Sequence, residues 1–266
     1  INVILITQSS SEHSICVAVD EANAPTAKQA VDKAFAYEIE TGKVDPLSIE
    51  SEQSILALVG DNMKSHPGIA GKMFNVLGKN GVNIRAIAQG SSERNISAVI
   101  ATHDVQKAIN VLHEAFFETS YKQVNLFITG VGNVGSKLLA QLQQQKQYLQ
   151  QHLKLQLNVA GIANSKKMLF IDEGIKLASW KEQLEKGSPM DLQKFVDGVI
   201  NKNLRNSVFV DVTANNEVAN MYEQLLMKSI SVVACNKIAA SSSYANYKKL
   251  KDLAHEFNCL FLFETN

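Results

Sequence analysis

The chain has 266 residues, enough for two domains of the usual ~100–200 residues each. A composition that is 45% hydrophobic and 20% charged is typical of a packed globular protein and excludes a disordered chain. The 26 basic and 26 acidic side chains balance, so no net charge attracts nucleic acid or an anionic membrane, and no apolar run reaches the ~20 residues of a membrane-spanning helix.

The N-terminal stretch INVILITQSSSE has neither a basic region nor a small-residue cleavage site, so a signal peptide is not predicted. Cys16, Cys235 and Cys259 are odd in number, far apart and each in an apolar run. We therefore expect buried, reduced thiols and a cytoplasmic protein. The six histidines never fall at the close spacing of a metal site, so no metal site is predicted.

A repeat occupies the first part of the chain. Residues 6–19 (ITQSSSEHSICVAV) align without a gap on residues 87–100 (IAQGSSERNISAVI), at an offset of 81 residues. The same offset aligns residues 27–35 on residues 108–116. Agreement of this length indicates a duplicated structural unit.

The second copy has the fuller set of elements. An apolar strand (54–60) precedes a helix that Pro67 is predicted to start and Gly81 to cap in the left-handed conformation. Two strands and a second amphipathic helix follow, at 82–89, 96–101 and 105–117. This order predicts a βαββα unit of the ferredoxin-like kind, and the first copy begins at its second strand.

A polar turn recurs in both copies, with Gln8 aligned on Gln89 and serines following each glutamine. A glutamine at a strand end, beside serines and backbone amides, can hold the amino and carboxyl groups of a small zwitterion. An ordinary solvated hairpin loop is the alternative. The candidate effector-binding residues are Gln8, Gln89, Ser91, Asn83 and Ile84.

A glycine turn follows the apolar strand VNLFIT (124–129), with glycines at the G-x-G-x-x-G spacing. The first glycine suits a tight turn, the second the approach of a pyrophosphate, and the third close helix–strand packing. The next helix, from about Val134 to Leu153, would point free N–H groups at the phosphates. The motif alone is weak evidence. The candidate cofactor-binding residues here are Gly130, Val131, Gly132, Asn133, Val134 and Gly135.

The rest of the chain supplies the context that the motif needs. Further strands are predicted at 155–164, 207–215, 229–237 and 259–265, with helices between them that include 217–227 and 244–257. Alternating strands and helices predict a doubly wound parallel sheet with ligands at the carboxyl ends of its strands. In this setting the glycine turn is interpreted as a dinucleotide site.

The acidic residue expected after the second strand, for the adenosine ribose, is absent. Asn164, Ser165 and Lys166 stand there as candidate cofactor-binding residues. The Ser165 hydroxyl and the cations of Lys166 and Lys167 suit a 2′-phosphate, so we expect NADP, with NAD possible. A solvated helix start is the alternative explanation of the lysines.

At the other strand ends, Thr213 and Asn215 are predicted to edge the nicotinamide. Lys237 would place an ammonium group at the cleft, where it could contact the cofactor and orient a carbonyl or hydroxyl substrate. It is the candidate catalytic residue, and a solvated loop lysine is the alternative.

These segments together resemble the bifunctional aspartokinase–homoserine dehydrogenases of threonine and methionine biosynthesis. The signs are ILITQSSSEHSI, GIAGKMFNVLGKNGVNIRAIAQGSSERNIS, GVGNVG, GIANSK, VDVTAN and NKIA, in the family's order over essentially the whole chain. The resemblance implies an α/β fold with a partial first ACT domain (1–50), a second ACT domain (51–120) and the NAD(P)-binding, Rossmann-type domain of homoserine dehydrogenase (121–266).

The resemblance also implies interconversion of aspartate semialdehyde and homoserine, control by an amino acid, typically threonine, that Gln8 and Gln89 contact, and a homo-oligomer joined through ACT domains. The family's kinase domain would precede residue 1, and its substrate domain would follow the terminal FETN. We therefore expect binding of nucleotide and effector without full turnover, and neither nucleic acid nor membrane as a partner.

Two other interpretations stay open. One is a non-catalytic amino-acid sensor in which the nucleotide fold serves as a scaffold. The other is a different oxidoreductase linked to ACT domains, against which VDVTAN and NKIA occurring together argue.

Overall fold

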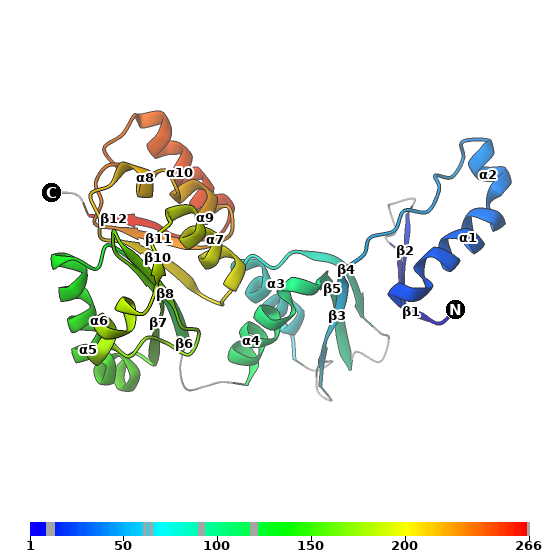
Figure 1. Ribbon diagram of the computed structural model, residues 1–266. Coiled ribbons are helices and arrows are strands. Elements are labelled where there is room, and N and C mark those ends of the chain that lie inside the picture. The colour runs from blue at the N-terminus through cyan, green and yellow to red at the C-terminus, as the bar shows by residue number, and fades with distance from the viewer. Residues whose placement is uncertain (9–13, 61–62, 64–65, 90–93, 118–121, 265–266) are drawn as a thin grey trace. The chain divides into compact units, whose positions relative to one another are not determined.

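The computed structural model describes residues 1–8, 14–60, 63, 66–89, 94–117 and 122–264 (Figure 1). Within these residues the chain separates into two compact units. The first comprises Ile1–Met73 and Val82–Gln106, and the second comprises Phe74–Gly81 and Lys107–Asn266. The first unit contains a two-stranded and a three-stranded sheet, and the second contains a seven-stranded sheet.

The first copy of the repeat starts with β1 (Val3–Gln8), which pairs antiparallel with β2 (Ile15–Val19). The 3-10 turn η1 (Glu21–Asn23) leads into α1 (Ala24–Ala34), which has a proline in its first turn, where a missing N–H breaks no helical hydrogen bond. The short helix α2 (Ala36–Glu40) follows.

The second copy has the predicted βαββα order. It consists of β3 (Gln53–Val59), α3 (Ile69–Lys79), β4 (Ile84–Gln89), β5 (Asn95–Ala101), η3 (Thr102–Asp104) and α4 (Val105–Phe116). The three strands form an antiparallel sheet in the order β3-β5-β4. The ferredoxin-like unit expected from the sequence is therefore confirmed in its order of elements.

Two predictions about the ends of α3 have different outcomes. Pro67 lies in a turn and α3 begins at Ile69, so the prediction that this proline starts the helix is wrong by two residues. The physical reason is Gly68, whose φ of 90° is incompatible with a helix. Gly81, with φ of 67°, follows α3 in the left-handed conformation, as predicted.

The duplication holds down to the strand register. Gln8 lies opposite Ile15 in the first copy, and Gln89 lies opposite Ile96 in the second. The pairing is interrupted between residues 3 and 5 of β1 and, at the same place, between residues 84 and 86 of β4. The turns η1 and η3 and the helices α1 and α4 also begin 81 residues apart. The repeat is therefore present in the structure as well as in the sequence.

The second unit contains a mixed sheet in the order β12-β11-β10-β6-β7-β8-β9. Five neighbouring strands are parallel to one another. β6 is the central strand of the sheet and lies between β7 and β10. These five strands are β6 (Lys122–Thr129), β7 (Leu155–Ala163), β10 (Ser207–Asp211), β11 (Ser231–Ala234) and β12 (Phe261–Phe263). The doubly wound parallel sheet predicted from the sequence is confirmed.

The antiparallel edge of this sheet was not predicted. β8 (Lys167–Phe170) pairs with β7, and the two-residue β9 (Ser188–Pro189) pairs with β8, both antiparallel. The strand β8 follows β7 after a tight turn. The alternative that the lysines at residues 166 and 167 start a helix is therefore wrong.

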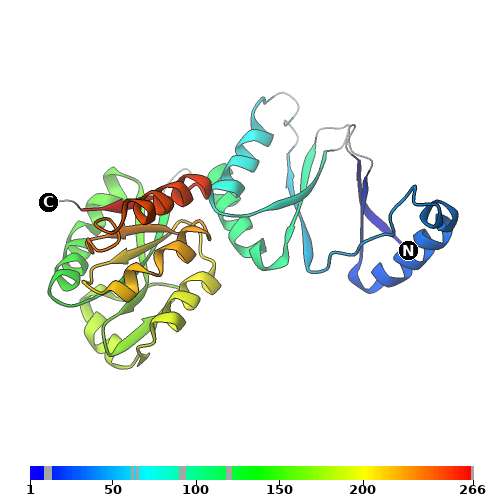
Figure 2. The same ribbon diagram turned by 90° about the horizontal axis from the view of Figure 1, so that it is seen from above.

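Helices cover both faces of the seven-stranded sheet (Figures 1 and 2). They are α5 (Asn133–His152), the 3-10 turn η4 (Leu177–Ser179), α6 (Trp180–Glu185), α7 (Leu192–Lys202), α8 (Asn216–Ala219), α9 (Tyr222–Leu226) and α10 (Tyr244–Glu256). The segment 217–227, predicted as one helix, is two short helices with a break at residues 220 and 221.

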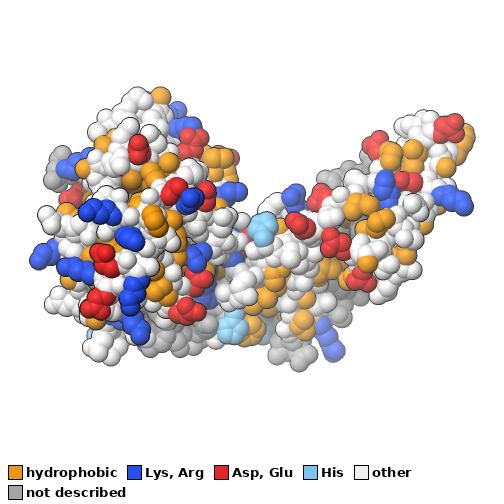
Figure 3. Space-filling view, in the orientation of Figure 1, with side chains coloured by type: hydrophobic (Ala, Val, Ile, Leu, Met, Phe, Trp, Pro, Cys, Tyr) orange, Lys and Arg blue, Asp and Glu red, His pale blue; other side chains and the backbone are white. Residues whose placement is uncertain are grey.

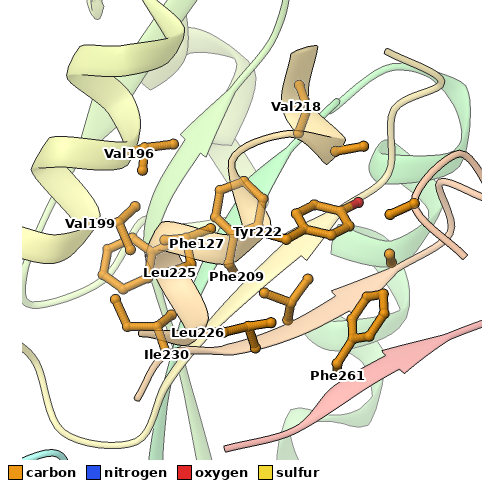
Figure 4. Packing of buried hydrophobic residues seen from close by; sticks show 14 of the residues in the cluster. Phe127, Val196, Val199, Phe209, Val218, Tyr222, Leu225, Leu226, Ile230 and Phe261 are labelled. Carbon is orange, nitrogen blue, oxygen red and sulfur yellow. The ribbon is translucent and has the colours of Figure 1, made fainter. Parts of the chain in front are cut away.

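Consecutive residues of the central strand face opposite cores, as expected for a parallel sheet buried on both sides. Phe127 packs in the cluster formed with α7, α9 and α10, whereas Leu126 and Ile128 pack in the cluster formed with α5 and α6. Aromatic rings connect the first cluster. Phe209 and Tyr222 have ring centroids 6.5 Å apart, and Tyr222 and Phe261 have centroids 5.8 Å apart (Figure 4).

Within the second unit, α4 is bonded to the loop that precedes β10. The Arg205 guanidinium donates to the carbonyl oxygen of Asn110 at 2.7 Å and to Gln123 Oε1 at 3.2 Å, and its Nε lies 3.2 Å from a carboxylate oxygen of Glu114. The backbone N–H of Asn206 donates to the side chain of Asn80 at 3.2 Å. These bonds lie at the amino-terminal edge of the sheet.

The cysteine prediction is partly wrong. Cys16 is exposed on β2, a strand without a buried residue, while Cys235 and Cys259 lie outside the strands β11 and β12, the first exposed and the second half-buried. Basic and acidic side chains are interspersed on the face shown in Figure 3. Among the described residues, no helix has the length and hydropathy to cross a bilayer, and no group of His, Cys, Asp and Glu side chains is arranged to hold a metal ion.

Candidate functional site

The first turn of the site depends on Gly130. Its φ is 92°, a conformation that side-chain-bearing residues rarely adopt. A Cβ atom there would also lie 2.7 Å from Cγ2 of Thr213 and 2.8 Å from the carbonyl group of Val212. The N–H groups of Gly130 and Val131 donate to the carbonyl oxygen of Ala163 at 2.9 and 3.2 Å, which ties the turn to the end of β7. The turn between β6 and α5 is thus fixed by its neighbours on both sides.

The other two glycines of the motif have different surroundings. Gly135 is buried, and a Cβ atom there would collide with the carbonyl oxygen of Gly130. At Gly132, by contrast, a Cβ atom would meet no atom within 4 Å among the described residues. Gly135 therefore allows the helix to approach the strand, while Gly132 leaves open space above the turn.

That open space lies at the start of α5, a helix of 20 residues. Gly132 is its N-cap, and no side chain caps the helix there. The first N–H groups of a helix need acceptors, and the positive end of the helix dipole favours an anion. An uncapped helix start with room beside it fits a pyrophosphate, so the residues present suit a dinucleotide. Asn133 and Val134 are exposed in this first turn.

The turn after β7 is closed by its own asparagine. The Asn164 side-chain oxygen accepts from the N–H groups of Lys166 and Lys167 at 2.8 and 2.7 Å. The Lys167 ammonium donates to the carbonyl oxygen of Gly187 at 3.1 Å, so this lysine has a structural partner. Ser165 and Lys166 are exposed at the tip. Asn164 shapes the turn, and the next two side chains are the ones presented to solvent.

At the end of β10, the predicted residues bond to their own loop. The Thr213 hydroxyl accepts from the N–H of Asn215 at 3.2 Å, and the Asn215 side chain accepts from the N–H of Glu217 at 2.8 Å. Asn215 is thus the N-cap of α8. Thr213 also lies against Gly130, so the glycine turn and the β10 loop are neighbours.

Lys237 is exposed in the loop after β11, three residues beyond the strand's last residue, Ala234. β10 and β11 are parallel neighbours, so their carboxyl ends share one edge of the sheet. The structure therefore places the glycine turn, the Thr213 loop and Lys237 along the same edge. The turn at residues 163–167 follows β7 on that edge as well.

Sequence reasoning missed three residues beneath this edge: Asp211, Tyr222 and Asn236, all buried. The Asp211 carboxyl group accepts from the Tyr222 hydroxyl at 2.5 Å and from the Asn236 side chain at 3.0 Å. Burial, together with Asp211, holds the pKa of the Tyr222 hydroxyl well above its usual range. The signal was present in the sequence, since Asp211 and Asn236 are polar residues at the ends of apolar strands.

The candidate effector residues lie on β1 and β4. Gln8 and Gln89 are exposed at equivalent ends of their strands. The Thr7 hydroxyl donates to the carbonyl oxygen of Ile87 at 3.0 Å, so β1 and β4 lie side by side. Asn83 and Ile84 lie at the opposite end of β4 from Gln89, roughly 17 to 20 Å away at ~3.3 Å per residue, so one copy does not bring them together with that glutamine. Ser91 is outside the described residues.

The parallel sheet, the glycine turn and the uncapped helix beside it define a Rossmann-type nucleotide-binding domain. The comparison with protein families makes this specific: the chain belongs to the family of homoserine dehydrogenase NAD-binding domains, which matches residues 130–264. The ACT domain family matches residues 1–35 and 56–116. The resemblance inferred from the sequence is confirmed.

Relatives that match almost the whole chain include bifunctional aspartokinase/homoserine dehydrogenases. The chain is 40% identical to the chloroplastic enzyme 2 of Arabidopsis thaliana over 265 residues, which cover 99% of the chain and 29% of that protein. It is 39% identical to the Haemophilus influenzae enzyme over 267 residues, which cover 100% of the chain and 32% of that protein. The chain therefore spans about a third of the length of these curated relatives.

Solved homoserine dehydrogenases resemble part of the chain. A hyperthermophilic archaeal homoserine dehydrogenase in complex with NADPH has 27% identity and a TM-score of 0.43, over 53% of the chain and 44% of that structure. The enzyme from Thermoplasma acidophilum has 15% identity and a TM-score of 0.43, over 54% of the chain and 43% of that structure.

Proposed function

We propose that this chain is the regulatory and cofactor-binding part of a bifunctional aspartokinase/homoserine dehydrogenase. The whole enzyme would interconvert aspartate semialdehyde and homoserine with a nicotinamide cofactor, under amino-acid control through ACT domains. The observation that carries the proposal is the glycine turn, with its uncapped helix start and the open space at Gly132. The domain boundaries proposed are 1–50, 51–120 and 121–266.

Each part of the sheet edge has a task in this function. The N–H groups at the start of α5 would hold the pyrophosphate, and the Thr213–Asn215 loop would border the nicotinamide. The bound cofactor supplies the hydride. Lys237, exposed beside that loop, would orient the carbonyl oxygen of the substrate through its ammonium group. The contribution to catalysis that we propose for this chain is thus to hold the cofactor and to orient the substrate.

Titration of the 266-residue chain with NADPH, followed by calorimetry, tests the cofactor site. Gly132→Val is the sharpest variant, because a Cβ atom there meets no described atom within 4 Å and the side chain would extend into the space proposed for the pyrophosphate. We expect wild-type binding to be saturable and the variant to lose it while staying folded. Gly71→Val is the matched control, since a Cβ atom there also meets nothing within 4 Å.

Failure of a well-folded wild-type chain to bind either NADPH or NADH would contradict the cofactor proposal. The interpretation of the chain as an amino-acid sensor with a nucleotide-like scaffold would then take its place.

We further propose a preference for NADP. The exposed Ser165 and Lys166, at the tip of a turn whose asparagine is already engaged, suit a 2′-phosphate. Lys166→Ala should weaken NADPH binding about tenfold, the loss of one charge-assisted hydrogen bond, and leave NADH binding unchanged. Lys146→Ala, an exposed lysine on α5, is the control. Tighter binding of NADH than of NADPH by the wild-type chain would refute the preference.

The regulatory half of the proposal rests on the neighbouring strands β1 and β4, which carry equivalent glutamines. Threonine should bind the chain, and Gln8→Ala and Gln89→Ala should each weaken its binding. Unchanged threonine affinity in both glutamine variants would remove these residues from the effector site.

ACT domains would join copies of the chain into a homo-oligomer, which sedimentation measures directly. The free cysteines support a reducing, cytoplasmic location.

A further inference from the structure

Asp211 is the last residue of β10 and is fully buried, yet it carries an acidic side chain. Both carboxyl oxygens are engaged: Oδ2 accepts from the Tyr222 hydroxyl at 2.5 Å and from Asn236 Nδ2 at 3.0 Å, and Oδ1 accepts from the N–H of Thr213 at 2.7 Å. Burying such a group costs free energy unless hydrogen bonds compensate for the lost water. The hydrogen bonds that satisfy this carboxyl group also fix the positions of the groups that donate them.

Asn236 extends the network to the neighbouring loop. Its side-chain NH2 group donates to the carbonyl oxygen of Asn215 at 2.9 Å as well as to Asp211, and its side-chain oxygen accepts from the N–H of Ile238 at 3.1 Å. Residues 236 and 238 flank Lys237. One buried amide therefore joins the backbone on both sides of Lys237 to the loop after β10.

The backbone pairing of the two strands does not involve these side chains. β10 and β11 are held by parallel backbone pairing from Val208 opposite Ser231 to Asp211 opposite Ala234, and the N–H of Cys235 donates to the Asp211 carbonyl oxygen at 2.8 Å. The side chains of Asp211 and Asn236 add hydrogen bonds to the loops that follow the two strands. They fix the two loops to each other and, through Tyr222, to the aromatic core (Figure 4).

We propose that Asp211 and Asn236 are positioning residues that hold Lys237 and the Thr213 loop in register at the nicotinamide end of the site. This inference rests on the proposed function. The two residues need not touch cofactor or substrate themselves. They set where the Lys237 ammonium group and the Thr213 backbone stand.

The adenosine end of the site gives the inference a specific signature. The Asn164 side chain closes the turn at residues 163–167 on the N–H groups of Lys166 and Lys167, and none of the hydrogen bonds given above for the Asp211 and Asn236 side chains reaches this turn directly. Loosening the network should therefore weaken binding of the nicotinamide half of the cofactor and leave binding of the adenosine half intact. A general loss of fold would weaken both.

The test compares two probes by calorimetry on the 266-residue chain: NADPH and 2′-phospho-ADP-ribose, which lacks the nicotinamide. Asn236→Ala should lower the affinity for NADPH about tenfold, equivalent to ~1.4 kcal/mol, and leave the affinity for 2′-phospho-ADP-ribose unchanged. Tyr222→Phe, which keeps the ring and removes one hydrogen bond to Asp211, should give a smaller change in the same direction.

Asn125→Ala is the matched control. Asn125 is as buried as Asn236 and donates to the carbonyl oxygen of Arg205 at 2.7 Å, but it lies near the amino end of the sheet. It should lower stability without separating the two probes. Equal effects of Asn236→Ala on both probes, or a wild-type chain that binds both with the same affinity, would overturn the inference. A wild-type chain that binds neither probe would instead refute the proposed cofactor site.

Discussion

At the scale of single residues, Cys259 shows how burial controls chemistry. Its thiol lies half-buried, 3.6 Å from the carbonyl oxygen of Leu226, and burial raises its pKa to about 11. Cys16 lies exposed on β2. Because the thiolate is the reactive form, we expect iodoacetamide at pH 8 to label Cys16 first and Cys259 last, as peptide mass spectrometry would measure. Equal labelling rates in the folded chain would contradict this expectation.

The same thiol makes stability depend on alkaline pH. The folded pKa of Cys259 is raised above the unfolded value of about 8.5, so the folded state keeps the proton longer. Stability is unaffected below the unfolded pKa and falls as pH rises from there toward about 11, because the unfolded chain binds fewer protons. Urea midpoints at pH 8 and pH 10 measure this, and Cys259→Ala should reduce the difference.

The three glycines of the turn separate stability from binding. Gly130→Ala combines a φ of 92° with a contact of 2.7 Å to Thr213, and Gly135→Ala collides with the Gly130 carbonyl group. Each should lower the free energy of unfolding by about 1–3 kcal/mol, measured by urea denaturation. Gly132→Ala meets no atom and should cost far less. Equal losses for all three variants would show that the turn is not built as described.

At the scale of elements, α7 depends on its N-cap. Asp191 Oδ1 accepts from the N–H of Lys194 at 3.0 Å, and this hydrogen bond lowers the pKa of the Asp191 carboxyl group. α7 carries Phe195, Val196 and Val199, all buried in the core. The cap therefore helps to form a helix on which one face of the sheet relies.

Asp191→Ala should lower the urea midpoint at pH 7. Because the folded pKa is lowered, the stabilisation by the cap is present above the unfolded pKa of about 3.9 and is lost as pH falls through the folded pKa. Variant and wild type should therefore converge at strongly acidic pH. Asp197→Ala, on the same helix but outside its first turn, is the control. A difference that persists unchanged in acid would argue against the cap.

Much of the element order followed from the sequence, because parallel strands are continuous apolar runs and the repeat doubled the signal at β1–β2 and β4–β5. The misses have local causes. β8 contains only four residues and follows a turn closed by the Asn164 side chain, which periodicity does not reveal. Gly68 delays the start of α3. The roles of Asp211 and Asn236 were not predicted, because nothing in the sequence distinguishes Tyr222, which bonds to Asp211, from an ordinary aromatic residue of the core.

At the scale of the whole molecule, the second unit joins its sheet to α4 through Arg205, which is nearly buried with Glu114, at 14% and 15% side-chain exposure. Arg205→Lys cannot reproduce three bonds made by a planar guanidinium. We expect a loss of about 1–3 kcal/mol in unfolding free energy and faster hydrogen exchange in α4. Arg85→Lys, at 53% exposure, is the control. An unchanged exchange rate in α4 would contradict this role.

The closed turn at Asn164 has a consequence for how such a protein can diversify. The Asn164 side chain bonds to the N–H groups of its own turn, while the neighbouring side chains of Ser165 and Lys166 are exposed, so we expect substitutions at residues 165 and 166 to change the proposed dinucleotide preference without disturbing the turn. The other end is interlocked, since Gly130 contacts Thr213 and Asn236 bonds to two loops. A new function there would need coordinated substitutions, so a protein engineer would begin at the turn after β7.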